Sequence, residues 1–381
     1  MYLLLLSFWG SATLVFYTYV VYPALTVLRS RLRPQPYRSA DITPAVSMII
    51  AAYNEAKSIG GKLDNIMLLD YPQECLEIII ASDGSSDGTD DIVRGYAAQG
   101  VKLLSLPRQG KAPALNAAVA ESTGDILIFS DANSMYAPDA IRALVRPFAD
   151  PEVGGVAGNQ TYFKSKQGGA AEGERSYWNF DQKLKQSQSQ AGNAISATGA
   201  IYAIRRSLFQ SVPDGVTDDF VTSTRVILQG HRLVFAPDAI AYESVAKSSG
   251  KEFGRKVRVI TRGFRSVWVN RELLNPFRHG FYSLQIFSQK VLRRLVVFPL
   301  LVMLVVSPLL WVQGFVYKSA TLVQFVFYSC ALVGAFFMRT RLGRAKIFSI
   351  PFFFSLVNLA SLKASLNIVQ GHRIDRWETQ R

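Results

Sequence analysis

An acid and an amide stand at the end of an apolar run in residues 126–135, "ILIFSDANSM". Asp131 closes the run, and Asn133 follows two residues later. Carboxylate and amide oxygens are hard ligands of the kind that Mg²⁺ or Mn²⁺ accepts, and phosphate oxygens can complete the coordination. The pair therefore predicts a metal site, provided that other groups of the chain converge on the same place.

Polar residues also follow three further apolar runs. Tyr53 and Glu55 come after the first run, Asp83 ends the second, and Lys111 follows the third. An acid can accept from the N–H of a base or from a ribose hydroxyl, and a lysine supplies a point charge for a diphosphate. Taken singly, each residue could be a turn residue, a helix cap or a solvated lysine. Together they predict a nucleotide site.

Short apolar runs that alternate with helical periodicity predict an α/β fold with a mostly parallel, Rossmann-like sheet covered by helices on both faces. The predicted strands are 46–52, 76–82, 101–106 and 125–130. In such folds ligands bind outside the carboxyl ends of the strands, which is where the polar residues stand. The sequence contains neither G-x-x-x-x-G-K-[ST] nor G-x-G-x-x-G, so a P-loop NTPase and a dinucleotide enzyme are not supported.

Long uncharged runs at both ends of the chain predict transmembrane helices, because a bilayer core needs about 20 apolar residues. We expect the following organisation: a transmembrane helix at 1–28, a cytoplasmic domain at 29–280, an interfacial amphipathic helix at 281–294, transmembrane helices at 295–317 and 319–338, a third C-terminal hydrophobic segment at 347–370 that spans or re-enters, and a tail at 371–381.

The distribution of basic residues sets the expected orientation. Arginines and lysines follow the first run, precede the second and follow the third, whereas the turn between the second and third holds only Lys318. The positive-inside rule then places the N-terminus outside and residues 30–290 in the cytoplasm. This topology, with contact to anionic lipid, accounts for the formal net charge of +14 without nucleic-acid binding. With two cysteines and three histidines, no zinc-ligand spacing is present.

Seven segments in order resemble the motifs of membrane-bound family 2 glycosyltransferases, the group that includes cellulose, chitin and hyaluronan synthases. They are "VSMIIAAYNEAKSI", "IIIASDGSSDGTDDI", "GKAPALNAAV", "ILIFSDANS", "ATGAIYAIRRSLF", "VTDDFVTSTRVILQGHRLVFAP" and "RKVRVITRG", within about residues 45–265. The resemblance implies a GT-A fold and a nucleotide-sugar donor.

The resemblance also implies roles for residues on the donor side. Ala52, Tyr53, Glu55 and Asp83 would hold the nucleotide, and Lys111 would face the diphosphate. Asp131 with Asn133 corresponds to the metal-binding D-x-D motif, and Gly199 belongs to the substrate site. The family usually has an acid where this chain has Asn133, and an amide contributes less charge to a metal.

On the acceptor side, Thr217 to Phe220 reads as a helix start in which two acids favour the helix dipole. The resemblance makes Asp219 the general base and Asp218 a substrate contact, and the helix N-terminus should keep Asp219 ionised at neutral pH. "RKVRV" aligns with the family's Q-x-x-R-W, so Arg255 replaces the glutamine and Arg258 matches as a diphosphate ligand. The tryptophan is replaced by Val259. Alternatively, these arginines form one basic face of a helix that lies on anionic lipid.

The expected function is inverting, Mg²⁺- or Mn²⁺-dependent transfer of a sugar, from a UDP-sugar by resemblance, to a lipid-linked or saccharide acceptor. It would take place at a bacterial-type inner membrane in a multi-pass protein, for cell-surface polysaccharide or glycolipid synthesis. A processive synthase that also translocates its polymer is the alternative. A transporter with a regulatory domain and a non-catalytic sugar-nucleotide binding subunit are the other classes. Nucleic acid is not expected as a partner, and the sequence leaves the oligomeric state open.

Overall fold

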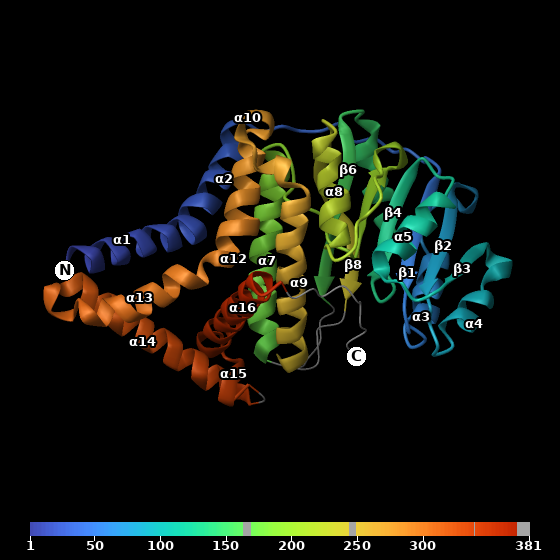
Figure 1. Cartoon of the computed structure of the whole chain (residues 1–381). Coiled ribbons are helices and arrows are strands. Elements are labelled where there is room, and N and C mark those ends of the chain that lie inside the picture. Colours follow the sequence, from blue (N-terminus) through green and yellow to red (C-terminus); the bar gives the residue numbers. More distant parts are fainter. Residues whose placement is uncertain (163–168, 244–248, 339, 372–381) are drawn as a thin grey trace.

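The computed structural model describes residues 1–162, 169–243, 249–338 and 340–371. It shows an α/β domain joined to a group of long apolar helices (Figure 1). The domain is built on one eight-stranded sheet with the strand order β3-β2-β1-β4-β7-β6-β8-β5. The strands are β1 (Val46–Ala52), β2 (Leu76–Asp83), β3 (Val101–Leu106), β4 (Ile126–Asp131), β5 (Met135–Tyr136), β6 (Val153–Tyr162), β7 (Tyr202–Arg205) and β8 (Arg232–Glu243).

Both faces of the central strands are buried. Along β1, Met48 and Ile50 enter one hydrophobic core, while Ile49 and Ala51 enter a second core on the opposite face. Successive side chains of a strand point to opposite faces, so a strand that is covered twice is apolar at nearly every position, and Ser47 is the one polar residue of β1. The predicted α/β fold and helix cover on both faces are confirmed.

Helices on each face supply these cores. α3 (Ile59–Met67) and α6 (Ala140–Val145) pack on one face, and α5 (Lys111–Ala120) and α8 (Asp218–Leu228) pack on the other. α4 (Thr89–Arg94) joins β2 to β3. Two longer helices, α7 (Gly169–Gln190) and α9 (Ser249–Val269), lie between the sheet and the apolar helices (Figure 1).

The sheet is mixed rather than uniformly parallel. Four of the seven strand pairings are parallel, and β7 and β5 supply the antiparallel ones. The chain leaves β1 for β2 and β3 on one side and returns to β4 on the other. The crevice between the carboxyl ends of β1 and β4 is therefore the switch point at which open α/β sheets bind ligands.

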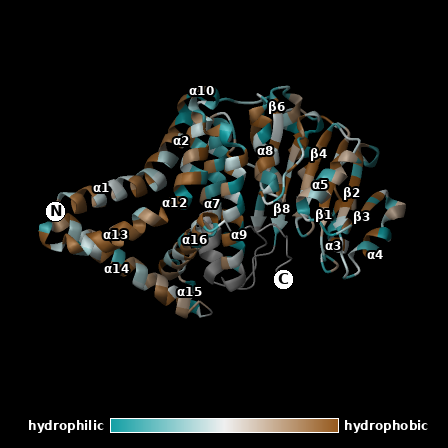
Figure 2. Cartoon of the chain, in the orientation of Figure 1, coloured by the Kyte–Doolittle hydropathy of each residue, from teal (hydrophilic) through white to brown (hydrophobic). Residues whose placement is uncertain are grey.

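Three helices within the described residues are long and apolar enough to cross a membrane: Tyr2–Leu32, Phe315–Phe336 (α14) and Lys346–Val369 (α16). The first comprises α1 (Tyr2–Phe16), a π-helical turn (Tyr17–Val21) and α2 (Tyr22–Leu32). A fourth candidate is the pair Phe281–Leu295 and Val297–Leu309, which is bent by 47°. Hydrophobic residues dominate these helices (Figure 2).

The uncharged run 295–317 is divided among several elements. α13 (Val297–Leu309) ends after Pro308, a 3-10 turn covers Trp311–Gln313, and α14 begins at Phe315. At 1.5 Å per residue α13 alone is about 20 Å long, short of a core of about 30 Å. The C-terminal segment, by contrast, is one continuous helix, α16, which is not interrupted at Pro351.

Residues 281–294 form α11 (Phe281–Ile286), a π-helical turn (Phe287–Leu292) and the start of α12 (Arg293–Leu295). One side of this segment packs into the α/β domain: the Tyr282 hydroxyl donates to the carbonyl of Ile195, and Arg293 pairs with Asp181 of α7 at 3.1 Å. The short helices α10 (Pro276–His279) and α15 (Arg341–Arg344) are the remaining α-helices of the described residues.

The N-terminal end of α1 and the turn between α13 and α14 lie together at the far end of the apolar helices (Figure 1). Phe8 packs with Val306 and Leu310, and the Trp9 indole N–H donates to the Tyr317 hydroxyl at 3.2 Å. The first turn of α1 and Lys318 are thus at the end opposite the α/β domain.

Candidate active site

The carboxyl ends of β1 and β2 form one wall of the site. Asp83 is buried, and its carboxylate accepts hydrogen bonds from the backbone N–H groups of Gln109 and Gly110 at 2.7 and 2.9 Å and from the Arg108 guanidinium. Gly84 has φ +68°, and a Cβ there would lie 2.8 Å from the Arg108 backbone nitrogen, so only glycine fits this close turn. Asp83 therefore anchors the loop that precedes Lys111.

Arg108 was not predicted as a site residue. Its guanidinium stacks over the Tyr53 ring with 3.4 Å between the guanidinium carbon and the ring centroid, in addition to pairing with Asp83. The sequence signal for Arg108 was its position in the loop after a predicted strand, three residues before Lys111. Arg108 adds a second cation to the wall that was predicted to face a nucleotide.

The other predicted residues of this wall differ in which of their atoms can contact a ligand. Glu55 is buried and accepts from the Ser58 hydroxyl at 2.6 Å, while its backbone N–H donates to Thr89. The Ala52 side chain is fully buried in the hydrophobic core, so only its backbone can reach a ligand. The prediction of Ala52 as a substrate contact is therefore limited to main-chain atoms.

Lys111 joins the two halves of the site. Its ammonium lies 2.8 Å from a carboxylate oxygen of Asp131 and 3.1 Å from one of Asp218. Burial works against the charged form, but the two carboxylates outweigh burial and raise the pKa of Lys111. Lys111 is therefore a fixed cation between β4 and the start of α8, as the predicted diphosphate contact requires.

The D-x-N segment offers a fitting set of oxygen ligands. The Asp131 carboxylate is one-third exposed, and Asn133 is exposed in the loop after β4. A Cβ on Gly199 would lie 2.9 Å from an Asp131 oxygen, so glycine at this position keeps the carboxylate open to a ligand. No group of three or more His, Cys, Asp or Glu suited to a metal occurs among the described residues. Phosphate oxygens would complete the coordination.

A buried lysine, Lys62, and a buried acid, Glu243, contact the D-x-N loop through Ser134, and neither was predicted as a site residue. The Lys62 ammonium donates to the Ser134 carbonyl at 2.6 Å, and the Ser134 hydroxyl donates to Glu243 at 2.7 Å. Burial lowers the pKa of Lys62 to about 7, although the charges of Asp131 and Glu243 oppose this shift. The available signal was a lysine among the apolar positions of α3.

Asp219 occupies the first turn of α8, where its side chain accepts from the Phe220 backbone N–H at 2.7 Å. Burial and the neighbouring Asp218 raise its pKa to about 6, against the lowering effect of Lys111. Burial and Asp218 therefore oppose the helix N-terminus, which was expected to keep Asp219 ionised at neutral pH. Asp219 is nevertheless mostly ionised at pH 7. Thr217 is the N-cap residue, but its side chain makes no capping hydrogen bond.

The two predicted arginines lie three residues apart on α9 and so share one side of this helix. Arg255 donates to both carboxylate oxygens of Glu252, at 3.0 Å each. Arg258 is half-buried. The roles of Arg255 and Arg258 as donor contacts stay predictions.

Asp219 also lines a cavity of about 540 Å³ between the α/β domain and the apolar helices. Val259 of α9 and residues of α7 and α16 line the same cavity. This volume lies in the range of small-ligand sites. The carboxylate of Asp219 therefore faces a space that is large enough for a second substrate.

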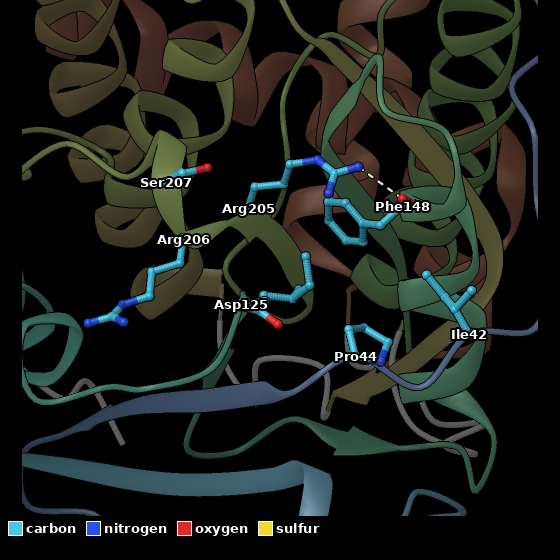
Figure 3. A pocket seen from close by; sticks show the side chains of 8 residues that line it. Ile42, Pro44, Asp125, Phe148, Arg205, Arg206 and Ser207 are labelled. Atoms are coloured by element: carbon cyan, nitrogen blue, oxygen red, sulfur yellow. Dashed lines mark hydrogen bonds between the residues drawn. The ribbon is translucent and has the colours of Figure 1, made fainter.

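A second cavity, of about 720 Å³, lies beside Pro44, Ile126 and Arg205, at the amino ends of β1 and β4 (Figure 3). The Arg205 guanidinium there donates to the backbone carbonyls of Phe148, Asp150 and Val153. This edge of the sheet is opposite the switch point, so the larger cavity takes no part in the site.

Comparison with known proteins agrees with this geometry. Residues 47–212 match the model of the family Glycosyl transferase family 2. Poly-beta-1,6-N-acetyl-D-glucosamine synthase of Staphylococcus aureus (strain COL) is 28% identical over 239 residues, which cover 61% of this chain and 57% of that protein. The synthase of the same name from Staphylococcus epidermidis is 28% identical over 221 residues, 56% of this chain and 53% of that protein. The chain thus spans just over half the length of these relatives.

Among solved structures, Mannosyltransferase PcManGT from Pyrobaculum calidifontis, in complex with GDP-Man and Mn2+, superposes with a TM-score of 0.70 at 23% identity. The superposition covers 92% of this chain and 97% of that chain, so the two share a fold that includes the apolar helices. Together with the strand-end acids and Lys111, these matches identify residues 47–212 as a family 2 glycosyltransferase domain with a GT-A fold.

Proposed function

We propose that this chain transfers a sugar, with inversion, from a nucleotide-sugar to a lipid-linked or saccharide acceptor at the cytoplasmic face of a membrane. The observation that carries the proposal is the chain of contacts from Asp131 through Lys111 to Asp218, next to Asp219 at the cavity. It joins a predicted donor site to a carboxylate that faces an open space. The comparison protein with GDP-Man and Mn2+ supports a nucleotide-sugar and a divalent ion as ligands.

In this proposal Asp219 accepts the proton of an acceptor hydroxyl as that oxygen forms a bond to the anomeric carbon. The bond from this carbon to the diphosphate breaks, and the electron pair leaves with the nucleoside diphosphate. Lys111 stabilises the charge that develops on the leaving group. A divalent ion held by Asp131 and Asn133 would supply Lewis-acid stabilisation of the same diphosphate. One base suffices for a single displacement, so inversion follows.

Incubation of the purified chain with UDP-, GDP- and dTDP-sugars in the presence of Mn²⁺ tests the proposal directly. Release of the nucleotide from one donor, dependent on an added acceptor, is the expected result. A transporter or a binding-only subunit would release none from any donor. UDP-sugars are the first to try, on the resemblance to the polysaccharide synthases.

The rate should depend on pH through Asp219. A general base works only when it is deprotonated, so transfer should rise with pH through about 6, the pKa of Asp219, and then level off. One unit below this pKa, at about pH 5, the rate should be roughly one-tenth of the plateau. The check is a profile of kcat/KM from pH 5 to 8 at saturating Mn²⁺. A flat profile down to pH 5 would contradict the assignment.

The proposed orientation has its own test. The far end of the apolar helices holds both the start of α1 and Lys318, which supports an outside location for both. In a background with Cys75 and Cys330 replaced by serine, cysteines at the exposed positions Gln99 and Lys318 should label differently with an impermeant thiol reagent. We expect labelling of intact cells at 318 and, only after permeabilisation, at 99. The reverse pattern would invert the topology.

A processive polysaccharide synthase is the second candidate. The relatives named poly-beta-1,6-N-acetyl-D-glucosamine synthase support it. In addition, Trp178 and Phe180 line the same cavity as Val259, where they offer aromatic surface to a sugar. Sizing the products at low conversion, with acceptor in large excess, separates the candidates. Long chains beside untouched acceptor would identify a processive enzyme, and uniform short additions would identify a single-step transferase.

A further inference from the structure

The position of Asn133 depends on the residue that follows it. Asp131 is the last residue of β4 and is fixed by the strand, whereas Asn133 lies two residues beyond it and is exposed. The next residue, Ser134, is fully buried, and its backbone N–H donates to the Asp131 carbonyl at 3.3 Å, which closes a turn. The contacts of Ser134 therefore also set where the Asn133 amide lies relative to the Asp131 carboxylate.

The pairing of β5 with β8 brings an acid opposite Ser134. These strands are antiparallel, and Met135 of β5 lies opposite Tyr242 of β8. One step along this register, Ser134 lies opposite Glu243, the last residue of β8. The Ser134 hydroxyl donates to one carboxylate oxygen of Glu243 at 2.7 Å. The strand register thus places this carboxylate on the turn that carries the predicted metal ligands.

Glu243 is itself fixed, because its other carboxylate oxygen is also bound. The side-chain amide of Gln160 in β6 donates to that oxygen at 2.5 Å, and both residues are buried. The backbone carbonyl of Gln160 accepts in turn from the Trp178 indole N–H at 2.6 Å and from the Gln182 amide at 3.2 Å, both on α7. Glu243 therefore ties the Ser134 turn to β6 and, through β6, to α7.

Two residues of α3 hold the backbone on the other side of the turn. The Lys62 ammonium donates to the Ser134 carbonyl at 2.6 Å and lies 3.8 Å from the centroid of the Tyr136 ring. The Asn65 side chain donates to the Tyr136 carbonyl at 3.0 Å and accepts from its N–H at 2.7 Å. These contacts fix the main chain that follows the turn, and Glu243 fixes the Ser134 side chain.

We propose that Glu243 is a positioning residue for the divalent ion: through Ser134 it fixes the turn so that Asp131 and Asn133 present their oxygens to one ion. The inference rests on the proposed function, which supplies the metal site. Groups that hydrogen-bond directly to metal ligands change metal affinity about 10- to 100-fold when they are removed. Glu243 acts one residue further away, so the effect of its removal should lie near the lower end, at about 10-fold.

Mn²⁺ binding to the full chain, followed by electron paramagnetic resonance, tests the proposal without turnover. UDP or GDP is present, whichever the parent binds with Mn²⁺. Glu243→Ala should weaken Mn²⁺ about 10-fold. Ser134→Ala, which removes only the hydroxyl, should weaken it in the same direction. Glu243→Gln can still accept from Ser134 and can donate to Gln160 once the Gln160 amide turns over, so Mn²⁺ affinity should stay within about 3-fold of the parent.

The glutamine variant separates position from charge. If the charge of Glu243 attracted the ion directly, the glutamine and alanine variants would weaken Mn²⁺ equally, and that result would overturn the proposal. Parental Mn²⁺ affinity in both Glu243→Ala and Ser134→Ala would overturn it as well. Glu152→Ala is the matched control, because it makes the same change at an exposed acid just before β6, and it should bind Mn²⁺ like the parent.

Nucleotide binding without metal shows whether each variant is folded, since the predicted nucleotide wall at Asp83 belongs to β2. We expect it to stay within about 2-fold of the parent. If Glu243→Ala loses this binding too, Ser134→Ala decides the question, because it deletes a single oxygen. If the parent binds nucleotide but no Mn²⁺, the metal site of the proposed function fails together with this inference. If the parent binds both and the alanine variants match it, only the positioning role fails.

Discussion

Replacing Asp219 by asparagine is expected to reduce sugar transfer roughly 10²- to 10⁴-fold, the usual cost of a lost general base. The amide keeps the size of the side chain and can still accept from the Phe220 N–H, but it cannot take up the proton of the acceptor. Asp219 lines the cavity beside the apolar helices, whereas Lys111 pairs with Asp131 and Asp218. In the proposed function the donor lies on the Lys111 side, so affinity for a nucleotide-sugar should stay within about 3-fold of the parent. Initial rates and calorimetric donor binding give the two readouts.

Asp214→Asn is a matched control, because it makes the same chemical change at an exposed acid five residues earlier. It should transfer sugar at the parental rate. Near-normal turnover in Asp219→Asn would move the base elsewhere. Asp218, which pairs with Lys111 at 3.1 Å, would be the next candidate.

Removing the carboxylate of Asp131 should abolish both Mn²⁺ binding and transfer. Asp131 is the charged member of the D-x-N pair, and Asn133 contributes only a neutral oxygen. Conversely, Asn133→Asp adds a charge to the ligand set and should tighten Mn²⁺ binding while transfer continues. Mn²⁺ binding followed by electron paramagnetic resonance, in the presence of nucleotide, measures both effects independently of turnover.

Asp139→Ala serves as the control for Asp131→Ala, since Asp139 is an exposed acid eight residues further on. It should leave Mn²⁺ binding and transfer unchanged. Full activity of the parent chain in excess EDTA, or unaltered Mn²⁺ binding in Asp131→Ala, would rule out the metal site.

Much of the domain could be predicted because its central strands are buried on both faces. The bounds of β1 and β3 match the predicted strands, β2 ends one residue later than predicted, and β4 is shifted by one residue at both ends. Parallel strands with polar residues at their carboxyl ends bring those residues together, which is why the proximity of Lys111 and Asp131 was predictable.

The parts that escaped prediction depend on contacts between distant segments. The pairing of Arg108 with Asp83 and of Lys62 with the Ser134 carbonyl requires the conformation of two loops, which no local pattern records. The break of the uncharged run 295–317 into several elements had local signals in the sequence, namely Pro308 and Gly314, which has φ +139°. A hydropathy average over the whole run does not register such single residues. The raised pKa of Asp219 arises from burial, which the helix-dipole argument leaves out.

The two ion pairs of Lys111 neutralise charge within the site itself, because the ammonium pairs with both Asp131 and Asp218. In the proposed function, a divalent ion that binds alone would compete with Lys111 for Asp131, and a nucleotide that binds alone would meet a lysine already paired with two carboxylates. With both ligands bound, Lys111 would pair with the diphosphate and Asp131 would be free to hold the metal, so each ligand would favour binding of the other. Such linkage is reciprocal. Metal and donor should therefore bind cooperatively, and the free ion should remain in solution until the nucleotide comes.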